Sequence, residues 1–256
     1  MLGNKLGLVM GVANHRSLAW AIATAAARNG AELILTYQDE RQGDEVRALA
    51  ADWPAVRLVL PCDVADDDAV AAMGKRLAGE FGGLDFAVHS IAFARREDLA
   101  GGVLATGREG WRTALETSAY SFNAMARAVA PLLEARGGGS LLTLTYLGGE
   151  RVVTGYGIMG IAKATLQHSV RYLAAELGPR NIRVNAISAG PVRTVAARGI
   201  PDFSEMHRRH AELAPLRRNV DADEIAESAL YLLGPSSRGV TGETLHVDAG
   251  FHLLAP

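Results

Sequence analysis

Residues 5–38 read KLGLVMGVANHRSLAWAIATAAARNGAELILTYQ, and this pattern predicts a strand, a helix and a second strand. The helical part follows Ser17 and stops at Gly30. The alternation continues to the end of the chain, with five more strands expected at 56–64, 84–94, 140–148, 181–189 and 243–251. Right-handed crossovers between such strands predict an α/β fold: a single doubly wound, seven-stranded parallel sheet, Rossmann-like, with its ligand at the C-terminal edge.

The composition narrows the class of protein. The chain has 256 residues, 49% of them hydrophobic and 21% charged, which suits one domain over 1–256. A net charge of -2 gives no reason to expect nucleic acid or an anionic membrane as partner. Cys62 is the only cysteine, and we expect it to be packed and inert. With neither a signal sequence nor a membrane span in the pattern, we expect a soluble, cytoplasmic protein.

The turn between the first strand and helix has features of a phosphate site. Gly11 allows a sharp turn, and Ser17 suits the cap of a helix whose free backbone N–H groups attract an anion. The second and third glycines of the common dinucleotide fingerprint are missing, so a plain strand-to-helix turn explains the motif about as well.

The ends of the next two strands fit an adenosine pocket. Gln38 stands where a dinucleotide fold meets the ribose, and a neutral amide there, with Asp39 and Glu40 following, favours NADH over NADPH, although Arg41 counts against it. Asp63 and Val64 suit an adenine, whereas Asp63 is also a candidate cap for the helix that starts near residue 66. A polar cap at the end of a strand is the alternative interpretation of Gln38 taken alone.

The middle of the chain places further residues at the same edge. The fourth strand runs into Ile91 and Ala92 at the switch point of the sheet, where both should line a cofactor. Residues 95–110 predict a loop whose charges, Asp98 among them, are solvated. A long helix should follow over about 108–136.

Two side chains seven positions apart are the candidate catalytic pair. If Tyr156 and Lys163 both lie on one α-helix, they share a face about 10 Å apart along its axis. The fifth strand delivers Tyr146 to the same place. The ordinary alternative is a half-buried tyrosine and an unrelated surface lysine.

Residues 191–220 predict a lid over the crevice. They hold six arginines against three acidic residues, which favours an acidic partner, although a solvated surface also explains the charge. His207 and His210 have helical i, i+3 spacing, but a solvated face beside Arg208 and Arg209 explains them better than a metal site. No metal site is predicted.

Together, the segments GVANHRSLAWAIA, TYQ, CDV, HSI, YLGGERV, YGIMGIAKA, GPRNIRVNAISAGPVRT and GETLHVDAGF resemble the NADH-dependent enoyl-acyl-carrier-protein reductases of bacterial fatty acid synthesis, type I. These are divergent short-chain dehydrogenase/reductases. Ordinary members of that superfamily carry Tyr and Lys four apart, whereas here Gly160 stands at four and Lys163 at seven, as in enoyl reductases.

The resemblance implies a function and a site. It implies hydride transfer from NADH to C3 of a trans-2-enoyl thioester carried by acyl carrier protein, with Tyr156 as oxyanion donor, Lys163 on the nicotinamide ribose and Tyr146 as a second donor or a wall. It also implies a homotetramer and a substrate contact at Ala94. The implied NAD contacts are Gly11, Ser17, Leu18, Gln38, Asp63, Val64, Ile91, Lys163, Val192, Arg193, Thr194, Val195 and Ala196.

Two departures from the family pattern concern pocket shape. Ala92 replaces an expected glycine, and Thr145 replaces the usual serine before Tyr146. Two other functions remain as alternatives. A short-chain carbonyl reductase would need the four-residue spacing and a serine where Thr143 stands, and a catalytically silent NAD-binding regulator would be expected to lack Tyr156 or Lys163.

Overall fold

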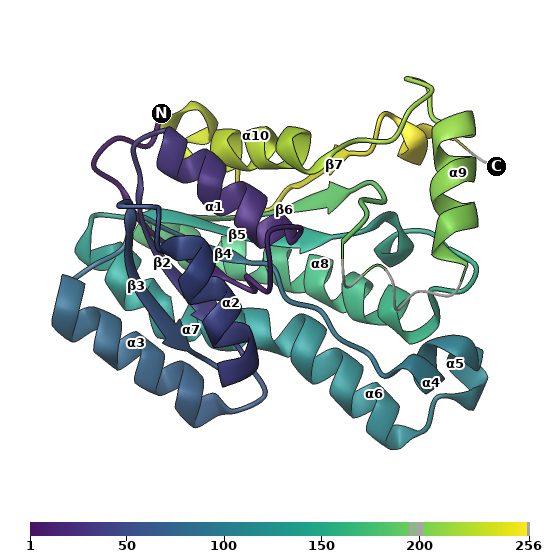
Figure 1. The fold of residues 1–256 in the computed structure, drawn as a ribbon, viewed down its shortest axis with the longest axis horizontal. Helices are drawn as coiled ribbons and strands as arrows, with labels where there is room; N and C mark the ends of the chain where they lie inside the picture. Colours follow the sequence, from purple (N-terminus) through teal and green to yellow (C-terminus); the bar gives the residue numbers. More distant parts are fainter. Residues whose placement is uncertain (195–196, 198–201, 255–256) are drawn as a thin grey trace.

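The computed structural model describes residues 1–194, 197 and 202–254, and its seven strands form one parallel sheet in the order β3-β2-β1-β4-β5-β6-β7 (Figure 1). This confirms the predicted doubly wound fold. The strands are β1 (Leu6–Met10), β2 (Glu32–Tyr37), β3 (Val56–Pro61), β4 (Phe86–His89), β5 (Gly139–Thr145), β6 (Ile182–Ala189) and β7 (Thr244–Val247).

Helices cover both faces of the sheet. Their bounds are α1 (Leu18–Arg28), α2 (Glu40–Ala50), α3 (Asp67–Phe81), α4 (Arg96–Ala100), α5 (Gly102–Ala105), α6 (Arg108–Leu115), α7 (Ser121–Ala135), α8 (Gly157–Leu177), α9 (Phe203–Leu213) and α10 (Ala222–Leu233). Helices α1, α2 and α10 pack on one face, while α3, α7 and α8 pack on the other. Because side chains alternate along a strand, Leu8 and Met10 of β1 join one core and Val9 the other.

The order of the strands shows where the ligand-binding crevice of the sheet lies. The chain moves from β1 outward to β2 and β3, and then returns to β4 on the other side of β1. The last residue pair of β1 and β4 is Met10 with His89, so the segments that follow these two strands diverge from one point. A ligand of such a sheet binds at this switch point.

The predicted loop over residues 95–110 is wrong. It contains α4 and α5, and α6 already begins at Arg108. Asp98 is buried rather than solvated: it pairs with Arg95 at 2.9 Å and lies against Gly110, where an added Cβ would be 2.3 Å from its carboxylate. A buried, paired carboxylate organises the segment, and no periodicity in the sequence signals that.

The long helix predicted over 108–136 is confirmed, but it is not regular. Between α6 and α7, residues Glu116–Tyr120 form a π-helical turn, and α7 then runs to Ala135. Such turns are rare and occur often at functional sites. Among the helices of the described residues, none is long and apolar enough to cross a membrane.

Candidate active site

The turn after β1 has the close approach that its glycine permits. Gly11 has a φ of 93°, and a Cβ on it would lie 2.3 Å from the Ser90 carbonyl oxygen. Ser17 caps α1 as predicted, since its hydroxyl accepts from the Trp20 N–H at 3.4 Å and donates to the Asn14 carbonyl at 2.7 Å. No acidic residue occupies the first turn of α1, which begins at Leu18, so nothing there opposes an anion.

The residues expected to meet the adenosine lie just past β2. Gln38 is exposed, and Asp39 caps α2 by accepting from the Gln42 N–H at 2.9 Å. Glu40 accepts from the Tyr37 hydroxyl at 2.9 Å and also pairs with an arginine of α2. Both acids are therefore already engaged by α2 or by the end of β2, and Gln38 alone of the three has its side chain free of such a role.

The two interpretations of Asp63 separate in the structure. The cap of α3 is Asp66, whose carboxylate accepts from two N–H groups of its first turn. Asp63 instead accepts from the Ala65 N–H at 3.0 Å, so the capping alternative was wrong. Val64 is buried in the core beside it. Cys62 is buried as predicted, and burial raises the pKa of its thiol to about 11, which keeps it unreactive.

The two tyrosines are in contact. Their ring centroids are 5.0 Å apart at an interplanar angle of 72°, an edge-to-face arrangement. Burial raises the pKa of Tyr156, and the neighbouring Tyr146 adds to the rise. Burial, with the charge of Asp248, raises the pKa of Tyr146 to about 12. Both phenols therefore keep their protons at neutral pH and act as donors.

The prediction that Tyr156 lies on the same helix as Lys163 is wrong. Tyr156 is the N-cap of α8, and Gly157 after it has a φ of 48°, in the left-handed region. The chain therefore turns between the tyrosine and the helix, so helical periodicity does not set the angle between Tyr156 and Lys163.

A glycine-lined 3-10 turn, Leu147–Gly149, brings the candidate catalytic groups together instead. A Cβ on Gly148 would be 2.4 Å from the Tyr156 ring, and a Cβ on Gly149 would be 2.9 Å from the backbone of Lys163. One turn of chain therefore packs against both residues, and only glycine fits at either position.

Lys163 is a buried amine. It is 6% exposed, and its Nζ donates to the Leu144 carbonyl at the end of β5 at 2.7 Å. Burial lowers the pKa of this amine to about 8, so it is mostly charged at pH 7. His89 lies nearby and is fully buried, and burial together with the lysine charge lowers its pKa to about 3. A neutral imidazole does not repel the ammonium.

The segment over the crevice contains α9. Tyr146 donates its hydroxyl proton toward the Met206 sulfur at 3.4 Å, which docks this helix on the tyrosine pair. Arg208 pairs with Glu205 and Glu212 of its own helix. His210 is buried and stacks on Phe251 with ring centroids 4.4 Å apart, so the predicted solvated face was wrong for this residue.

Only three of the five residues predicted to bind the cofactor at 192–196 are described by the structure. Val192 packs against the core, Arg193 is exposed, and the Thr194 hydroxyl accepts from the Ala197 N–H at 3.1 Å. Val195 and Ala196 lie outside the described residues.

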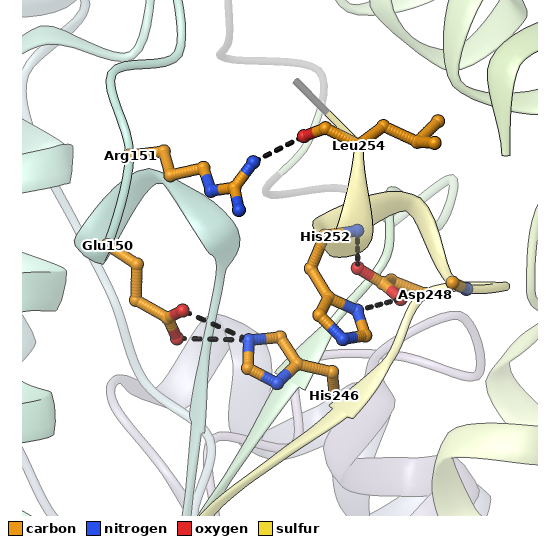
Figure 2. Close-up of polar contacts among 7 residues, drawn as sticks. Glu150, Arg151, His246, Asp248, His252 and Leu254 are labelled. Carbon is orange, nitrogen blue, oxygen red and sulfur yellow. Dashed lines mark hydrogen bonds and ion pairs between the residues drawn. The ribbon is translucent and has the colours of Figure 1, made fainter. Parts of the chain in front are cut away.

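A polar network joins the segment after the glycine turn to the end of β7 (Figure 2). Glu150 accepts from His246 at 3.1 Å, His246 stacks on His252 with ring centroids 4.1 Å apart, and His252 pairs with Asp248 at 2.9 Å. Gln167 of α8 also donates to Glu150 at 3.2 Å. The network ties the end of β7 to the turn that supports the tyrosines.

The residues fit a dinucleotide. The Thr145 hydroxyl is buried at the C-terminal end of β5, and among the described residues it has no hydrogen-bond partner, so it is a donor left for a ligand. The capped, acid-free start of α1 suits a pyrophosphate. Ile91 is half-buried against the core, and Ala94 packs into the cluster that holds Tyr156.

Comparison with known proteins decides the family. The profile described as "Enoyl-(Acyl carrier protein) reductase" matches residues 11–252. The chain belongs to the enoyl-(acyl-carrier-protein) reductase family. It is 48% identical to the Bacillus cereus enoyl-(acyl-carrier-protein) reductase (NADH) FabI, over 99% of both chains, and 46% identical to enzyme 1 of Rhizobium meliloti, over 99% of this chain and 92% of that one.

Solved structures of the family agree with the fold. The Bacillus cereus reductase, in complex with NADP+ and indole naphthyridinone, has a TM-score of 0.96 and covers 100% of this chain and 99% of its own. The Anaplasma phagocytophilum reductase, in complex with NAD, has a TM-score of 0.95 at 47% identity, with 100% of this chain and 96% of that chain covered. Both likenesses span the whole reductase fold.

Several residues that shape this reductase site had no usable signal in the sequence. His89, Met206 and Ser118 come from segments far apart in the chain, and only the fold brings them to the site. The glycine pair 148–149 was visible, and two glycines after a strand that ends in a tyrosine could have indicated a close approach.

Proposed function

We propose that this chain is an NADH-dependent enoyl-(acyl-carrier-protein) reductase that saturates the C2–C3 double bond of a trans-2-enoyl thioester in fatty acid elongation. Family membership over nearly the whole chain supports the reaction class. The observation that carries the chemistry is the contact of buried Tyr156 with partly buried Tyr146, both protonated and both packed on the same glycine turn as a buried lysine.

The binding residues divide by the part of the dinucleotide they would hold. The start of α1 takes the pyrophosphate, the end of β2 the adenosine ribose, the end of β3 the adenine, and the ends of β4 and β6 the nicotinamide half. When bound, NADH supplies the hydride that reaches C3 of the enoyl thioester. The residues assigned to it are Gly11, Ser17, Leu18, Gln38, Asp63, Val64, Ile91, Lys163, Val192, Arg193, Thr194, Val195 and Ala196.

Tyr156 stabilises the charge that develops on the thioester oxygen. Its raised pKa keeps the proton on the phenol, so the group donates a hydrogen bond to the enolate oxygen. A preorganised donor in a dry site contributes on the order of 3 kcal/mol to lowering the barrier. The enolate then takes a proton at C2, and the saturated acyl thioester leaves.

Lys163 and Tyr146 support that donor. The Lys163 ammonium, held by the Leu144 carbonyl, keeps two further N–H donors for the ribose hydroxyls and adds positive potential beside the enolate. Tyr146 packs edge-on against Tyr156 and fixes its ring. Ala94, in the same cluster as Tyr156, is the expected contact for the acyl thioester.

The preference for NADH rests on Gln38. The amide binds ribose hydroxyls but supplies no charge for a 2′-phosphate. Relatives include Staphylococcus aureus enzymes, 44% identical, that carry NADPH in their names, so the family supports both cofactors. The engagement of Asp39 and Glu40 within α2 leaves Gln38 as the deciding side chain.

The remaining assignments concern assembly and partners. We place the chain as a single reductase domain over 1–256, cytoplasmic and homotetrameric, with acyl carrier protein as the substrate carrier and residues 191–220 as a substrate lid. The contact of Met206 with Tyr146 supports the lid. Because Arg208 is neutralised within α9, an acidic carrier would be recognised through the exposed Arg209.

NADH oxidation with crotonyl-CoA, and then with an enoyl-acyl-carrier protein, tests the reaction. Tyr156→Phe should lower turnover roughly a hundredfold and leave NADH affinity within twofold, because only the oxyanion donor is removed. Tyr172→Phe, at an exposed tyrosine on α8, is the control. No turnover by the unmodified enzyme on either substrate would refute the proposed function, and an undiminished rate in Tyr156→Phe would refute the role of the phenol.

The structure weighs against the alternative of a carbonyl reductase. The lysine of that class would stand at position 160, where a Cβ would lie 2.8 Å from the Gly148 carbonyl oxygen. A silent NAD-binding regulator predicts cofactor binding with no turnover, and the assay above separates it from the enzyme.

A further inference from the structure

Two buried serines, one within the π-helical turn Glu116–Tyr120 and one just after it, contact the end of β4 and the segment that follows it. Ser121 lies just after the turn, and its hydroxyl is 2.8 Å from Nε2 of His89, the last residue of β4. Ser118 lies within the turn and reaches Phe93, four residues beyond that strand. The widened helix thus contacts both the end of the strand and its extension.

Ser118 satisfies both backbone polar groups of one residue. Its hydroxyl accepts from the Phe93 N–H at 2.9 Å and donates to the Phe93 carbonyl at 3.1 Å. Ser118 is fully buried, whereas the Phe93 side chain is half exposed. A serine hydroxyl has one proton and two lone pairs, so this arrangement uses its only proton and one lone pair.

The segment that follows β4 makes few hydrogen bonds to the residues that the structure describes. Pairing of β4 with β1 ends at His89, and the Ser90 N–H still donates to the Met10 carbonyl at 3.1 Å. From Ile91 to Ala94, no hydrogen bond to the described residues exists except the two with Ser118. Ile91 and Ala94 pack against hydrophobic clusters, but the hydrogen bonds of this segment to the described residues therefore come from one side chain of a neighbouring helix.

The proposed function places this segment between the cofactor and the substrate. Ile91 is assigned to the nicotinamide and Ala94 to the acyl thioester, with Phe93 between them. Ser118 also lies 3.8 Å from the sulfur of Met159, which packs in the same cluster as Tyr156. A shift of the Phe93 backbone would therefore move Ile91, which is assigned to the nicotinamide, relative to the Tyr156 hydroxyl.

We infer that Ser118 is a positioning residue of the reductase: its hydroxyl holds the Ile91–Ala94 backbone in the conformation that binds the nicotinamide half of NADH and the enoyl thioester. The inference rests on the proposed function for the ligands. The tethering itself rests only on the two hydrogen bonds and on the lack of other hydrogen bonds from residues 91–94 to the part of the chain that the structure describes.

Ser118→Ala removes one oxygen atom and adds no bulk, so the fold should persist. A neutral hydrogen bond changes an equilibrium by roughly fivefold. We therefore expect deuterium exchange of the cofactor-free protein to accelerate about fivefold in the peptide spanning residues 90–95. The dissociation constant of NADH, from fluorescence titration, and KM for crotonyl-CoA should each rise about fivefold, while kcat falls less than twofold.

Ser140→Ala is the matched control. Ser140 is equally buried and donates to the Leu232 carbonyl at 2.9 Å, at the opposite end of the sheet. It should lower overall stability comparably and leave both exchange at 90–95 and NADH binding unchanged. Unchanged exchange at 90–95 in Ser118→Ala, or equal effects of the two variants on NADH binding, would overturn the inference. Exchange and NADH titration need no turnover, so an inactive wild-type enzyme would count against the proposed function alone.

Discussion

Burial of Lys163 predicts a specific pH dependence of stability. The folded pKa of about 8 lies below the ordinary value of 10.5, so the native state binds this proton less tightly than the unfolded chain does. The resulting cost is fully present below pH 8 and disappears as pH rises from 8 toward 10.5. Lys163→Met removes the titrating group and keeps most of the volume.

The magnitude follows from the two pKa values. Linkage gives a cost of about 3 kcal/mol at pH 7 and about 1.4 kcal/mol at pH 9.5. The variant also strands the Leu144 carbonyl, at about 1 kcal/mol, but that loss does not depend on pH. The stability of Lys163→Met relative to wild type should therefore fall by roughly 2 kcal/mol between pH 7 and pH 9.5.

Urea unfolding followed by circular dichroism at both pH values, without NADH and at one fixed protein concentration, measures this difference. Lys75→Met, at an exposed lysine of α3, controls for removing a charge and should show no such trend. A stability difference between Lys163→Met and wild type that stays constant from pH 7 to pH 9.5 would refute the claim that burial depresses this amine. NADH affinity should fall in Lys163→Met at both pH values, because the ribose donor is lost.

Two further substitutions test local geometry and cofactor choice. Gly160→Ala places a Cβ 2.8 Å from the Gly148 carbonyl oxygen, so it should displace the turn beneath Tyr156. The free energy of unfolding in urea should fall by about 1–3 kcal/mol, and kcat should fall as well. Unchanged kcat and stability would contradict this packing. Gln38→Arg should raise the ratio of kcat/KM for NADPH to kcat/KM for NADH by about tenfold, because the guanidinium compensates the charge of a 2′-phosphate. An unchanged ratio in steady-state assays would show that other residues select the cofactor.

Much of the fold followed from local pattern. The alternation of apolar runs with helical segments predicted all seven strands, and the cap at Ser17 and the end of α8 at Leu177 were both predicted. Errors arose where a distant partner overrode the local signal. The charges of residues 95–98 suggested a loop because nothing nearby shows that Asp98 is buried against Gly110.

In the candidate active site, too, local pattern predicted the residues but not how they are brought together. The residue types Tyr146, Tyr156 and Lys163 and their spacing were visible in the sequence, but the reason proposed for their proximity was helical periodicity. The structure instead places Tyr156 before the helix and uses the Gly148–Gly149 turn to bring the groups together. Spacing along a chain reports on local geometry only while the backbone stays regular.

By itself, the sequence determined the alternation of strands and helices that a doubly wound sheet requires and the chemical groups at its C-terminal edge, because apolar periodicity and turn residues are local properties. Tertiary structure alone decided the protonation of the tyrosines and Lys163, the neutrality of His89 and the hold of Ser118 on Phe93. Burial and hydrogen bonding depend on which distant segments pack together, and a pKa or a tether exists only once they do.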